Sequence, residues 1–334
     1  MNNKPVLTIV IPCYNEEEVF QDTAKQLTDM LHVLIDDNLI SYDSSLLFVD
    51  DGSHDRTWDL IESESLVNPF VKGLKLAHNA GHQNALLAGL TVASEHSSCV
   101  ISIDADLQDD INAIRTFVEK YHEGYDIVYG VRDSRETDTF FKRTTAEGFY
   151  WVMRKLGIQL IPNHADFRLM SKRALDELLK YKETNLFLRG IIPLLGFPST
   201  KVMYDRKKRL AGESKYPLKK MLAFAFDGIT SFSIAPIRFV TSLGFISVLL
   251  SILVGIYAFI QKQMGHTSTG WTSLILSIWF LGGIELIAIG LVGEYIGKIF
   301  KEVKRRPRFS IETNLYSKRD KKKRLIHSGN HGRG

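Results

Sequence analysis

Two aspartates separated by a single alanine are the residues of this sequence best suited to chemistry. Asp104 and Asp106 directly follow the apolar run Cys99–Ile103, which has the composition of a strand buried on both faces. Two carboxylates in this arrangement can hold a hard divalent cation, Mg2+ or Mn2+, and leave coordination positions open for a diphosphate. A D-x-D pattern is also common in solvated loops, so its place after a buried strand is what favours a metal site here.

The elements that must position these acids alternate along the first 130 residues. Apolar, β-branched runs predict strands at Val6–Pro12, Ser45–Val49, Val71–Ala77, Cys99–Ile103 and Asp126–Tyr129. Segments with a helical spacing of apolar residues lie between them, at Glu16–Asp36, Asp55–Ser63, Asn84–Ser94 and Ile111–Tyr121. This alternation predicts an α/β fold with a doubly wound sheet, whose ligands bind beyond the carboxyl ends of the strands.

Polar residues gather directly after these predicted strands. Asp50 and Asp51 could cap the helix that begins near Asp55, but Asp51 could also accept a hydrogen bond from a nucleotide base, which we favour. His82 could contact a diphosphate or a sugar, or only pack at the start of a helix. Two common nucleotide-binding loops, G-x-x-x-x-G-K-[ST] and a G-x-G-x-x-G after the first strand, are absent from the sequence.

Two long apolar runs near the end of the sequence predict transmembrane helices at residues 239–260 and 272–296. The first is 22 residues without a charge, and at about 1.5 Å per residue it matches a hydrocarbon core of about 30 Å. Between the predicted α/β domain and this run, residues 216–238 place two lysines before an aromatic-rich stretch. This pattern favours a juxtamembrane amphipathic helix at the membrane interface, with an ordinary amphipathic helix of the soluble domain as the alternative.

Charge predicts the orientation of these helices. The whole chain carries +4, but Lys298–Gly334 contains 13 Lys or Arg and 3 Asp or Glu. Basic residues flank both runs, while the loop Gln261–Trp271 has one lysine. The positive-inside rule therefore predicts a multi-pass protein of the cytoplasmic (inner) membrane, with residues 1–215 and the basic tail 297–334 in the cytoplasm. The tail is expected to bind anionic membrane lipids rather than nucleic acid; a solvated, disordered tail beyond Ile311 is the alternative.

Composition agrees with a folded, reduced protein. With 45% hydrophobic and 24% charged residues, the sequence is not that of a disordered, collagen-like or coiled-coil protein. Cys13 and Cys99 lie in apolar runs and are expected to be reduced core residues. No signal peptide is recognisable at the start of the sequence.

Seven motifs, in order, resemble those of a known family. They are TIVIPCYNEE (8–17), FVDDGSHDRT (48–57), NAGHQNALLAG (79–89), DADLQD (104–109), ADFRLMS (165–171), RLAGESKYP (209–217) and GEYIGKIFKEVKRRP (293–307). Together they resemble the family 2 glycosyltransferases of GT-A fold, most closely the polyprenyl-phosphate glycosyltransferases of the bactoprenol glucosyltransferase and dolichol-phosphate mannose synthase group. The Q-x-x-R-W segment of the processive membrane synthases is absent.

The resemblance implies a metal-dependent, inverting transfer of a sugar from a nucleotide sugar to undecaprenyl phosphate, for modification of a cell-envelope glycan. UDP-glucose is the favoured donor and UDP-N-acetylglucosamine the next. A phosphate nucleophile is already anionic and needs positioning and desolvation more than a strong base. The alternatives are a diacylglycerol or polysaccharide acceptor, or a non-catalytic membrane subunit that binds a nucleotide sugar. A homo-oligomer formed through the transmembrane helices is also expected to be possible.

The resemblance also assigns roles to residues. Asp166 matches the position of a catalytic base or acceptor orienter, although it could instead cap the following segment. The expected catalytic residues are Asp166, Asp106 and Arg132, and the expected metal ligands are Asp104 and Asp106. The expected nucleotide-sugar site comprises Pro12, Tyr14, Glu16, Asp51, His82, Asp104 and Ala105. Cations suited to the lipid phosphate are Arg143, Arg168, Arg209 and Lys215, because a guanidinium can bind phosphate through two hydrogen bonds.

Overall fold

The chain divides into two compact units, an α/β unit and a helical unit. The computed structural model describes residues 4–132, 164–183, 187–205, 235–264 and 270–316. The α/β unit takes in the chain up to residue 214, apart from a short piece near residue 155, and the segment after residue 306. The intervening segment, from residue 215 to 306, belongs to the helical unit.

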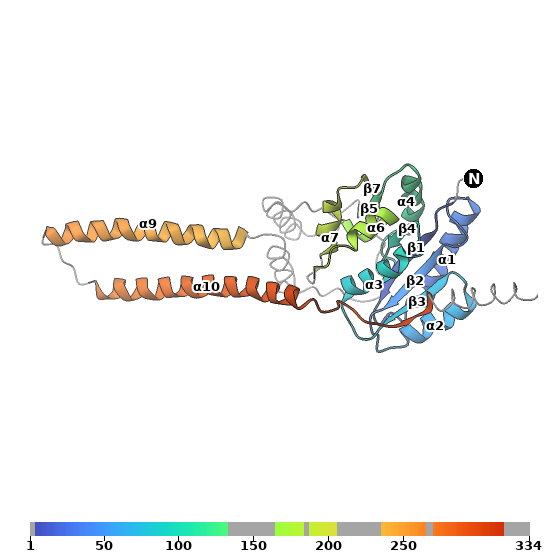
Figure 1. Cartoon of the computed structure of the whole chain (residues 1–334), viewed down its shortest axis with the longest axis horizontal. Coiled ribbons are helices and arrows are strands. Elements are labelled where there is room, and N and C mark those ends of the chain that lie inside the picture. Colours follow the sequence, from blue (N-terminus) through green and yellow to red (C-terminus); the bar gives the residue numbers. More distant parts are fainter. Residues whose placement is uncertain (1–3, 133–163, 184–186, 206–234, 265–269, 317–334) are drawn as a thin grey trace, which may run out of the picture. The chain divides into compact units, whose positions relative to one another are not determined.

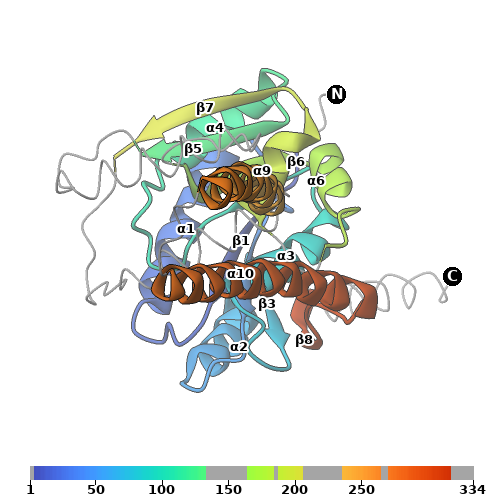
Figure 2. The same ribbon diagram turned by 90° about the vertical axis from the view of Figure 1, so that its left-hand side faces the viewer.

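A mixed sheet forms the centre of the α/β unit (Figures 1 and 2). Its strands are β1 (Leu7–Cys13), β2 (Ser45–Asp50), β3 (Val71–Leu76), β4 (Cys99–Ser102), β5 (Ile127–Arg132), β6 (His164–Ser171), β7 (Ser199–Tyr204) and β8 (Ile311–Asn314). The order across the described part of the sheet is β7-β5-β6-β4-β1-β2-β3-β8. Strands β6 and β8 run antiparallel to their neighbours, whereas the other pairings are parallel.

Helices cover both faces of this sheet. They are α1 (Phe20–Asp36), α2 (Thr57–Val67), α3 (His82–Ser94), α4 (Ala113–His122), α6 (Lys172–Leu178), α7 (Leu188–Ile191) and the 3-10 turn η1 (Ile192–Leu195). Ile9 of β1 shares a buried core with Phe20 of α1, whereas Val10 faces the opposite helix, α3. There Gly89 approaches so closely that a Cβ atom would lie 2.4 Å from Val10 Cγ1. Because both faces of β1 are covered, its sequence is continuously apolar.

The predicted strands and helices of the first 132 residues are confirmed, with ends that differ by a few residues. Strand β5 extends to Arg132, three residues beyond its predicted end. Strands β6, β7 and β8 are not predicted by the sequence pattern. Strand β6 carries Asp166 and Arg168 within a buried strand, which interrupts the apolar run that marks such a strand. The alternation in β7 places mostly polar side chains on its exposed face.

The end of the described chain returns to the sheet as a segment that we call the C-terminal strap, residues 307–316. Its strand β8 pairs antiparallel with β3, and Lys75 Nζ lies 3.1 Å from Glu312 Oε1. The side chain of Tyr316 is buried, with its hydroxyl 3.0 Å from Ser45 Oγ. The alternative of a solvated, disordered tail beyond Ile311 is therefore wrong for residues 312–316. The open edge of β3 offers backbone N–H and C=O groups that this segment satisfies.

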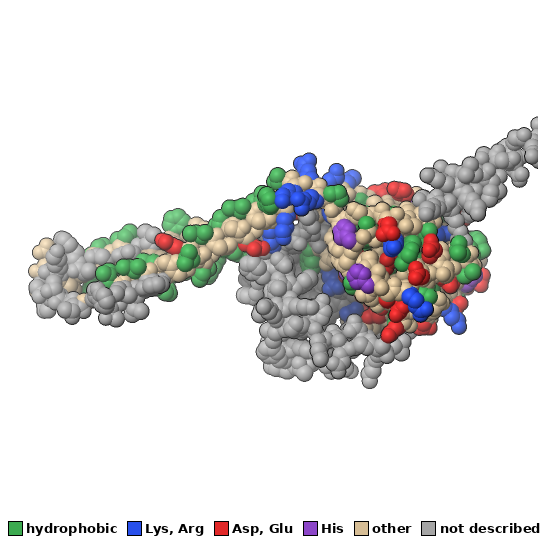
Figure 3. Space-filling model, turned by 90° about the horizontal axis from the view of Figure 1, so that it is seen from below, with side chains coloured by type: hydrophobic (Ala, Val, Ile, Leu, Met, Phe, Trp, Pro, Cys, Tyr) green, Lys and Arg blue, Asp and Glu red, His purple; other side chains and the backbone are tan. Residues whose placement is uncertain are grey.

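The helical unit contains two long helices, α9 (Ala235–Gln263) and α10 (Trp271–Lys304), that contact each other. Both are long and apolar enough to cross a membrane, with candidate spans at Pro236–Val254 and Phe280–Lys304. Hydrophobic side chains cover much of the visible face of these helices (Figure 3). Helix α10 continues eight residues past the predicted end at Ile296, into the predicted basic tail. Residues 216–234 of the predicted juxtamembrane segment lie outside the described residues.

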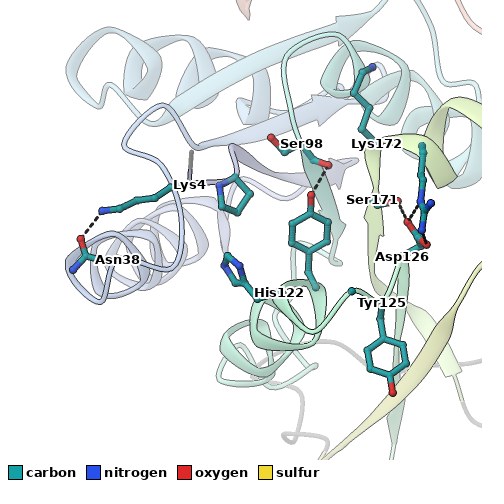
Figure 4. Close-up of a pocket in the computed structure, with 12 residues that line it drawn as sticks. Lys4, Asn38, Ser98, His122, Tyr125, Asp126, Ser171 and Lys172 are labelled. Carbon is teal, nitrogen blue, oxygen red and sulfur yellow. Dashed lines mark hydrogen bonds and ion pairs between the residues drawn. The ribbon is translucent and has the colours of Figure 1, made fainter. Parts of the chain in front are cut away.

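A cavity of about 620 Å³ lies at the amino-terminal end of the sheet (Figure 4). Residues that precede β1, β4 and β5 line it, and its lysine, arginine and aspartate side chains all have hydrogen-bond partners. Asp126 accepts hydrogen bonds from Ser171 Oγ at 2.7 Å and from Arg173 Nε at 2.5 Å, and Lys172 Nζ donates to the Ser94 carbonyl at 2.7 Å. Ligands of a doubly wound sheet bind at the other end, so this cavity is not the expected site.

Asp126 gives this end of the sheet a pH-dependent stability. Burial alone would raise the pKa of Asp126, but hydrogen bonds from Arg173 and Ser171 outweigh it and hold the pKa below its ordinary value. This stabilises the fold above the unfolded pKa of about 3.9 and is lost as pH falls through the folded pKa. We expect Asp126→Asn to lower the free energy of unfolding by about 1–3 kcal/mol at pH 7. In thermal denaturation the difference from wild type should shrink below about pH 4; a constant difference down to that range would contradict this account.

Candidate active site

Acidic and basic side chains meet at the carboxyl-terminal ends of β4 and β5. They come from five places: the start of α3, the loop after β4, the end of β5, strand β6 and helix α7. We call this group the acid–arginine cluster, which consists of His82, Asp104, Asp106, Asp109, Arg132, Asp166, Arg168 and Arg189. Six of these eight were predicted as site residues from the sequence; Asp109 and Arg189 were not.

Strand β6 places Asp166 and Arg168 on one face of the sheet. Side chains alternate along a strand, so Phe167 between them points to the other face, where its ring lies 4.6 Å from that of Phe117. Arg168 donates from Nη2 to Asp166 Oδ1, and only 2% of its side chain is exposed. A cation that binds a lipid phosphate must be accessible. The buried position of Arg168 does not fit the predicted role in binding that phosphate.

Asp166 is held by a second arginine from helix α7. Arg189 donates from Nη2 to Asp166 Oδ2 at 3.0 Å and from Nε to Oδ1 at 3.3 Å. Burial alone would raise the pKa of Asp166, but His82, Arg168 and Arg189 hold it well below its usual range. Asp166 is therefore ionised near neutral pH and is a weak proton acceptor. It lies inside a strand, so the alternative that it caps a following segment is wrong.

The loop after β4 presents the two predicted metal ligands. Asp106 accepts from Gln108 Nε2 at 2.7 Å, while 41% of the Asp104 side chain is exposed. Desolvation by the surrounding protein raises the pKa of Asp104; His82 opposes this, and the charges of Asp166, Asp109 and Asp106 raise the pKa further. This excess of negative charge around Asp104 is what a bound cation would relieve.

The donor set fits a magnesium-like ion that is shared with a substrate. Within the described residues, no group of three or more His, Cys, Asp or Glu side chains is arranged to hold a metal by itself. Mg2+ is usually bound by one or two carboxylates together with water and substrate phosphates. Asp104 and Asp106 supply carboxylate oxygens of this kind, so they would hold the ion with part of its coordination left to a diphosphate.

His82 bridges the two halves of the cluster. Its Nε2 lies 3.6 Å from Asp104 Oδ1 and 3.6 Å from Asp166 Oδ2. The Asp166 carboxylate raises the pKa of the imidazole, Asp104 adds to this, and burial opposes it. His82 is also the first residue of α3, and its contact with a diphosphate or a sugar stays a prediction.

Asp51 fixes the loop that carries His82. Its two carboxylate oxygens accept from Ala80 N at 2.7 Å and Gly81 N at 3.0 Å, so the carboxylate binds backbone in this structure. Gly52 has φ of 69°, and a Cβ atom there would lie 2.7 Å from Asn79 N. Only glycine allows this close approach of two loops. The alternative that Asp51 caps α2 is wrong.

Asp55 lies two residues before the first residue of α2, Thr57, and its Oδ1 accepts from the Thr57 backbone N–H at 3.0 Å. The N-cap residue itself, Arg56, makes no capping hydrogen bond with its side chain. Burial alone would raise the pKa of Asp55, but hydrogen bonds from Thr57 and from the Glu17 backbone hold it below its ordinary value. Asp50 accepts from Ser53 N at 3.3 Å, so it shapes the turn before the helix.

The predicted nucleotide-binding residues of the β1–α1 loop lie beside the β2–α2 loop. Pro12 is buried within β1, whereas 42% of Tyr14 is exposed. Asn15 N donates to Ser53 Oγ at 2.9 Å, and Glu16 N donates to Thr57 Oγ1 at 2.9 Å. These bonds tie the two loops together and leave the Tyr14 ring available to a ligand.

The other predicted residues divide into those that the structure describes and those that it does not. Arg132 donates from Nη2 to Asp109 Oδ1 at 3.0 Å, and the Tyr204 hydroxyl donates to the same atom at 2.6 Å. The Ala105 carbonyl accepts from Thr23 Oγ1 at 2.6 Å. Three predicted cations lie outside the described residues: Arg143, Arg209 and Lys215.

Sequence reasoning missed Arg189, and a signal for it was present. Arg189 is the one charged residue in the stretch 186–196, and the other side chains of this stretch are apolar. A charged side chain within such a stretch needs a partner when the segment packs, and Asp166 is that partner. Asp109 was quoted within the DADLQD motif but given no role; its place seven residues after the end of buried strand β4 carried no separate signal.

Two family models together match most of this chain. The model of "Glycosyl transferase family 2" matches residues 8–179, and that of the "GtrB C-terminal hairpin" matches residues 235–299. The chain therefore belongs to glycosyl transferase family 2, and its sheet has the predicted GT-A type of fold.

Its similarity to individual proteins covers nearly the whole chain. An uncharacterized glycosyltransferase, YkoT, of Bacillus subtilis is 67% identical over 94% of this chain and 94% of its own. The SfII prophage-derived bactoprenol glucosyl transferase of Shigella flexneri is 39% identical over 92% of this chain and 97% of its own. Among solved structures, mannosyl-3-phosphoglycerate synthase from Rubrobacter xylanophilus has a TM-score of 0.42 and 15% identity, covering 79% of this chain and 76% of that one.

Proposed function

We propose that this protein transfers glucose from UDP-glucose to undecaprenyl phosphate, with inversion at the anomeric carbon. The observation that carries the proposal is the acid–arginine cluster at the carboxyl ends of the strands, in a chain similar along its length to a bactoprenol glucosyl transferase. UDP-N-acetylglucosamine is the next candidate donor. The product would be a lipid-linked sugar for modification of a cell-envelope glycan.

The donor would bind across the loops after β1, β2 and β4. The exposed ring of Tyr14 is available to stack on the base, and Glu16 and Asp51 border the same region. Asp104 and Asp106 would hold Mg2+ or Mn2+, which when bound neutralises charge on the departing diphosphate. Arg132, kept in place by Asp109, supports the same developing charge.

Asp166 would act on the acceptor by orientation rather than by removing a proton. Its depressed pKa makes it a weak base, and a phosphate acceptor is already ionised near neutral pH, so no base is needed. A fixed carboxylate that holds Arg189 and lies 3.6 Å from His82 can instead keep the cations of the site in place. This arrangement favours positioning of the nucleophilic oxygen as the main contribution.

Helices α9 and α10 would anchor the enzyme in the membrane that contains its lipid acceptor. We infer that both helices span it and that the α/β unit is cytoplasmic, because Lys and Arg flank the helices and are scarce between them. An impermeant thiol reagent applied to whole cells should label a cysteine introduced at residue 267 and not one at residue 330. The reverse pattern would overturn the orientation.

The full-length protein in detergent or vesicles should be assayed with a panel of nucleotide sugars and three acceptors. We expect a metal-dependent lipid product from UDP-glucose with undecaprenyl phosphate, and none with diacylglycerol or a polysaccharide. Transfer to diacylglycerol would overturn the proposed acceptor. Binding of UDP-sugar without product from any acceptor would instead indicate a non-catalytic subunit.

A further inference from the structure

Two arginines bind the same carboxylate from different environments. Arg168 and Arg189 both donate to Asp166, yet 2% of the Arg168 side chain is exposed and 38% of that of Arg189. The buried guanidinium of Arg168 balances the buried charge of Asp166. The positive charge of Arg189 is therefore only partly neutralised within the protein.

The orientation of Arg189 leaves one side of its guanidinium for another anion. Both hydrogen bonds to Asp166 use the edge formed by Nε and Nη2, so the side that carries Nη1 points away from that carboxylate. Asp166, the partner of Arg189, lies 3.6 Å from His82 Nε2, and the same nitrogen lies 3.6 Å from Asp104 Oδ1. Arg189 is therefore a near neighbour of the predicted metal ligands.

Helix α7 fixes the position of this guanidinium. Leu188 and Ile191, which flank Arg189 on the helix, are buried. The Leu188 backbone N–H donates to Gln83 Oε1 of α3 at 3.4 Å. An arginine held by its helix and by a carboxylate loses little side-chain freedom when it binds a ligand.

We propose that Arg189 is a substrate-binding residue that donates hydrogen bonds to a phosphate oxygen of a substrate. The inference rests on the proposed function, in which both substrates carry phosphate. It assigns to Arg189 the role that the sequence suggested for Arg168, because Arg189 is the accessible arginine on Asp166. The phosphate is either the diphosphate of the donor or the monophosphate of the lipid acceptor.

The test separates these two sources by direct binding. The full-length protein, with Mg2+ present, is titrated with UDP and with a short-chain prenyl phosphate, using wild type, Arg189→Gln and Arg189→Lys. We expect Arg189→Gln to weaken one of the two ligands by about 10-fold to 100-fold, because a charge-assisted hydrogen bond is lost. Arg189→Lys should recover part of this affinity, since it keeps the charge but not the two-pronged geometry. The ligand affected identifies the phosphate.

A matched variant and a folding measurement exclude a purely structural role. Arg173→Gln removes an arginine that also pairs with a buried aspartate, Asp126, at the other end of the sheet, and it should leave both affinities unchanged. Thermal unfolding of each variant shows whether the fold survives. Equal affinity of wild type and Arg189→Gln for both ligands would overturn the inference, as would a wild type that binds neither. A wild type that binds both ligands but forms no lipid product would instead overturn the proposed function.

Discussion

Replacement of Asp104 by asparagine should reduce glycosyl transfer by at least about 100-fold while the chain still folds. Asparagine keeps the shape and removes one negative charge from the pair that would bind the cation. The Asp104 side chain is 41% exposed and its pKa is raised by burial and by the neighbouring acids. Loss of this charge therefore relieves repulsion in the free protein, and the melting temperature should stay the same or rise. The combination of lost activity and retained stability would show that the Asp104 carboxylate serves the reaction rather than the fold.

The same loop offers a control. Asp110→Asn alters another acid of this loop. The Asp110 carboxylate accepts from Asn112 N at 3.2 Å at the start of a helical turn, and asparagine is an equally good cap. This variant should keep most of its activity. Steady-state rates at increasing Mg2+ and Mn2+ concentrations, with and without EDTA, give the measurement. Full activity of wild type in excess EDTA, or of Asp104→Asn, would show that these carboxylates do not bind a required metal.

A stop codon after Pro307 should destabilise the α/β unit by more than about 3 kcal/mol, which is the usual scale for removal of one large buried aromatic side chain. The truncation deletes β8 and with it the buried ring of Tyr316, whose neighbours include the stacked ring of His96 at 4.5 Å. It also exposes the outer edge of β3. Activity should fall with stability although no residue of the acid–arginine cluster is removed.

A second truncation isolates the strap from the basic residues that follow it. A stop codon after Lys318 keeps residues 307–316 and removes most of the final basic run. Its thermal unfolding in detergent should match that of the full chain. If both truncated proteins unfold at the wild-type temperature, the strap does not contribute to the stability of the sheet.

The sequence predicted the strands that are buried on both faces, and it did so for a physical reason. A central parallel strand such as β1 must be apolar along its length, and that run is visible without any knowledge of its neighbours. Strand β6 is also central, but it contains an ion pair, Asp166 with Arg168, that is satisfied only by the folded protein. Strand β8 has four residues and depends on a β3 edge that is more than 200 residues away in the sequence.

The candidate site was likewise predicted in part: the residues that follow buried strands were predicted, but their partners from other elements were not. Residues that follow buried strands, such as Asp104 and His82, meet because the strand ends meet. Which of two nearby arginines is buried depends on packing of β6 and α7, and no local pattern contains that information. The pairing of Asp51 with two backbone N–H groups likewise needs the path of a neighbouring loop.

The position of β8 has a consequence for how the protein is made. Ribosomes add about 5–20 residues per second, so roughly 10–50 seconds separate the emergence of β3 from that of residues 311–314 at those rates. Both apolar helices are synthesised in that interval. During it, the β3 edge is exposed and able to pair with other chains. The sheet of the α/β unit is therefore completed only after both long apolar helices have been synthesised, and the β3 edge must stay unpaired with other chains throughout that interval.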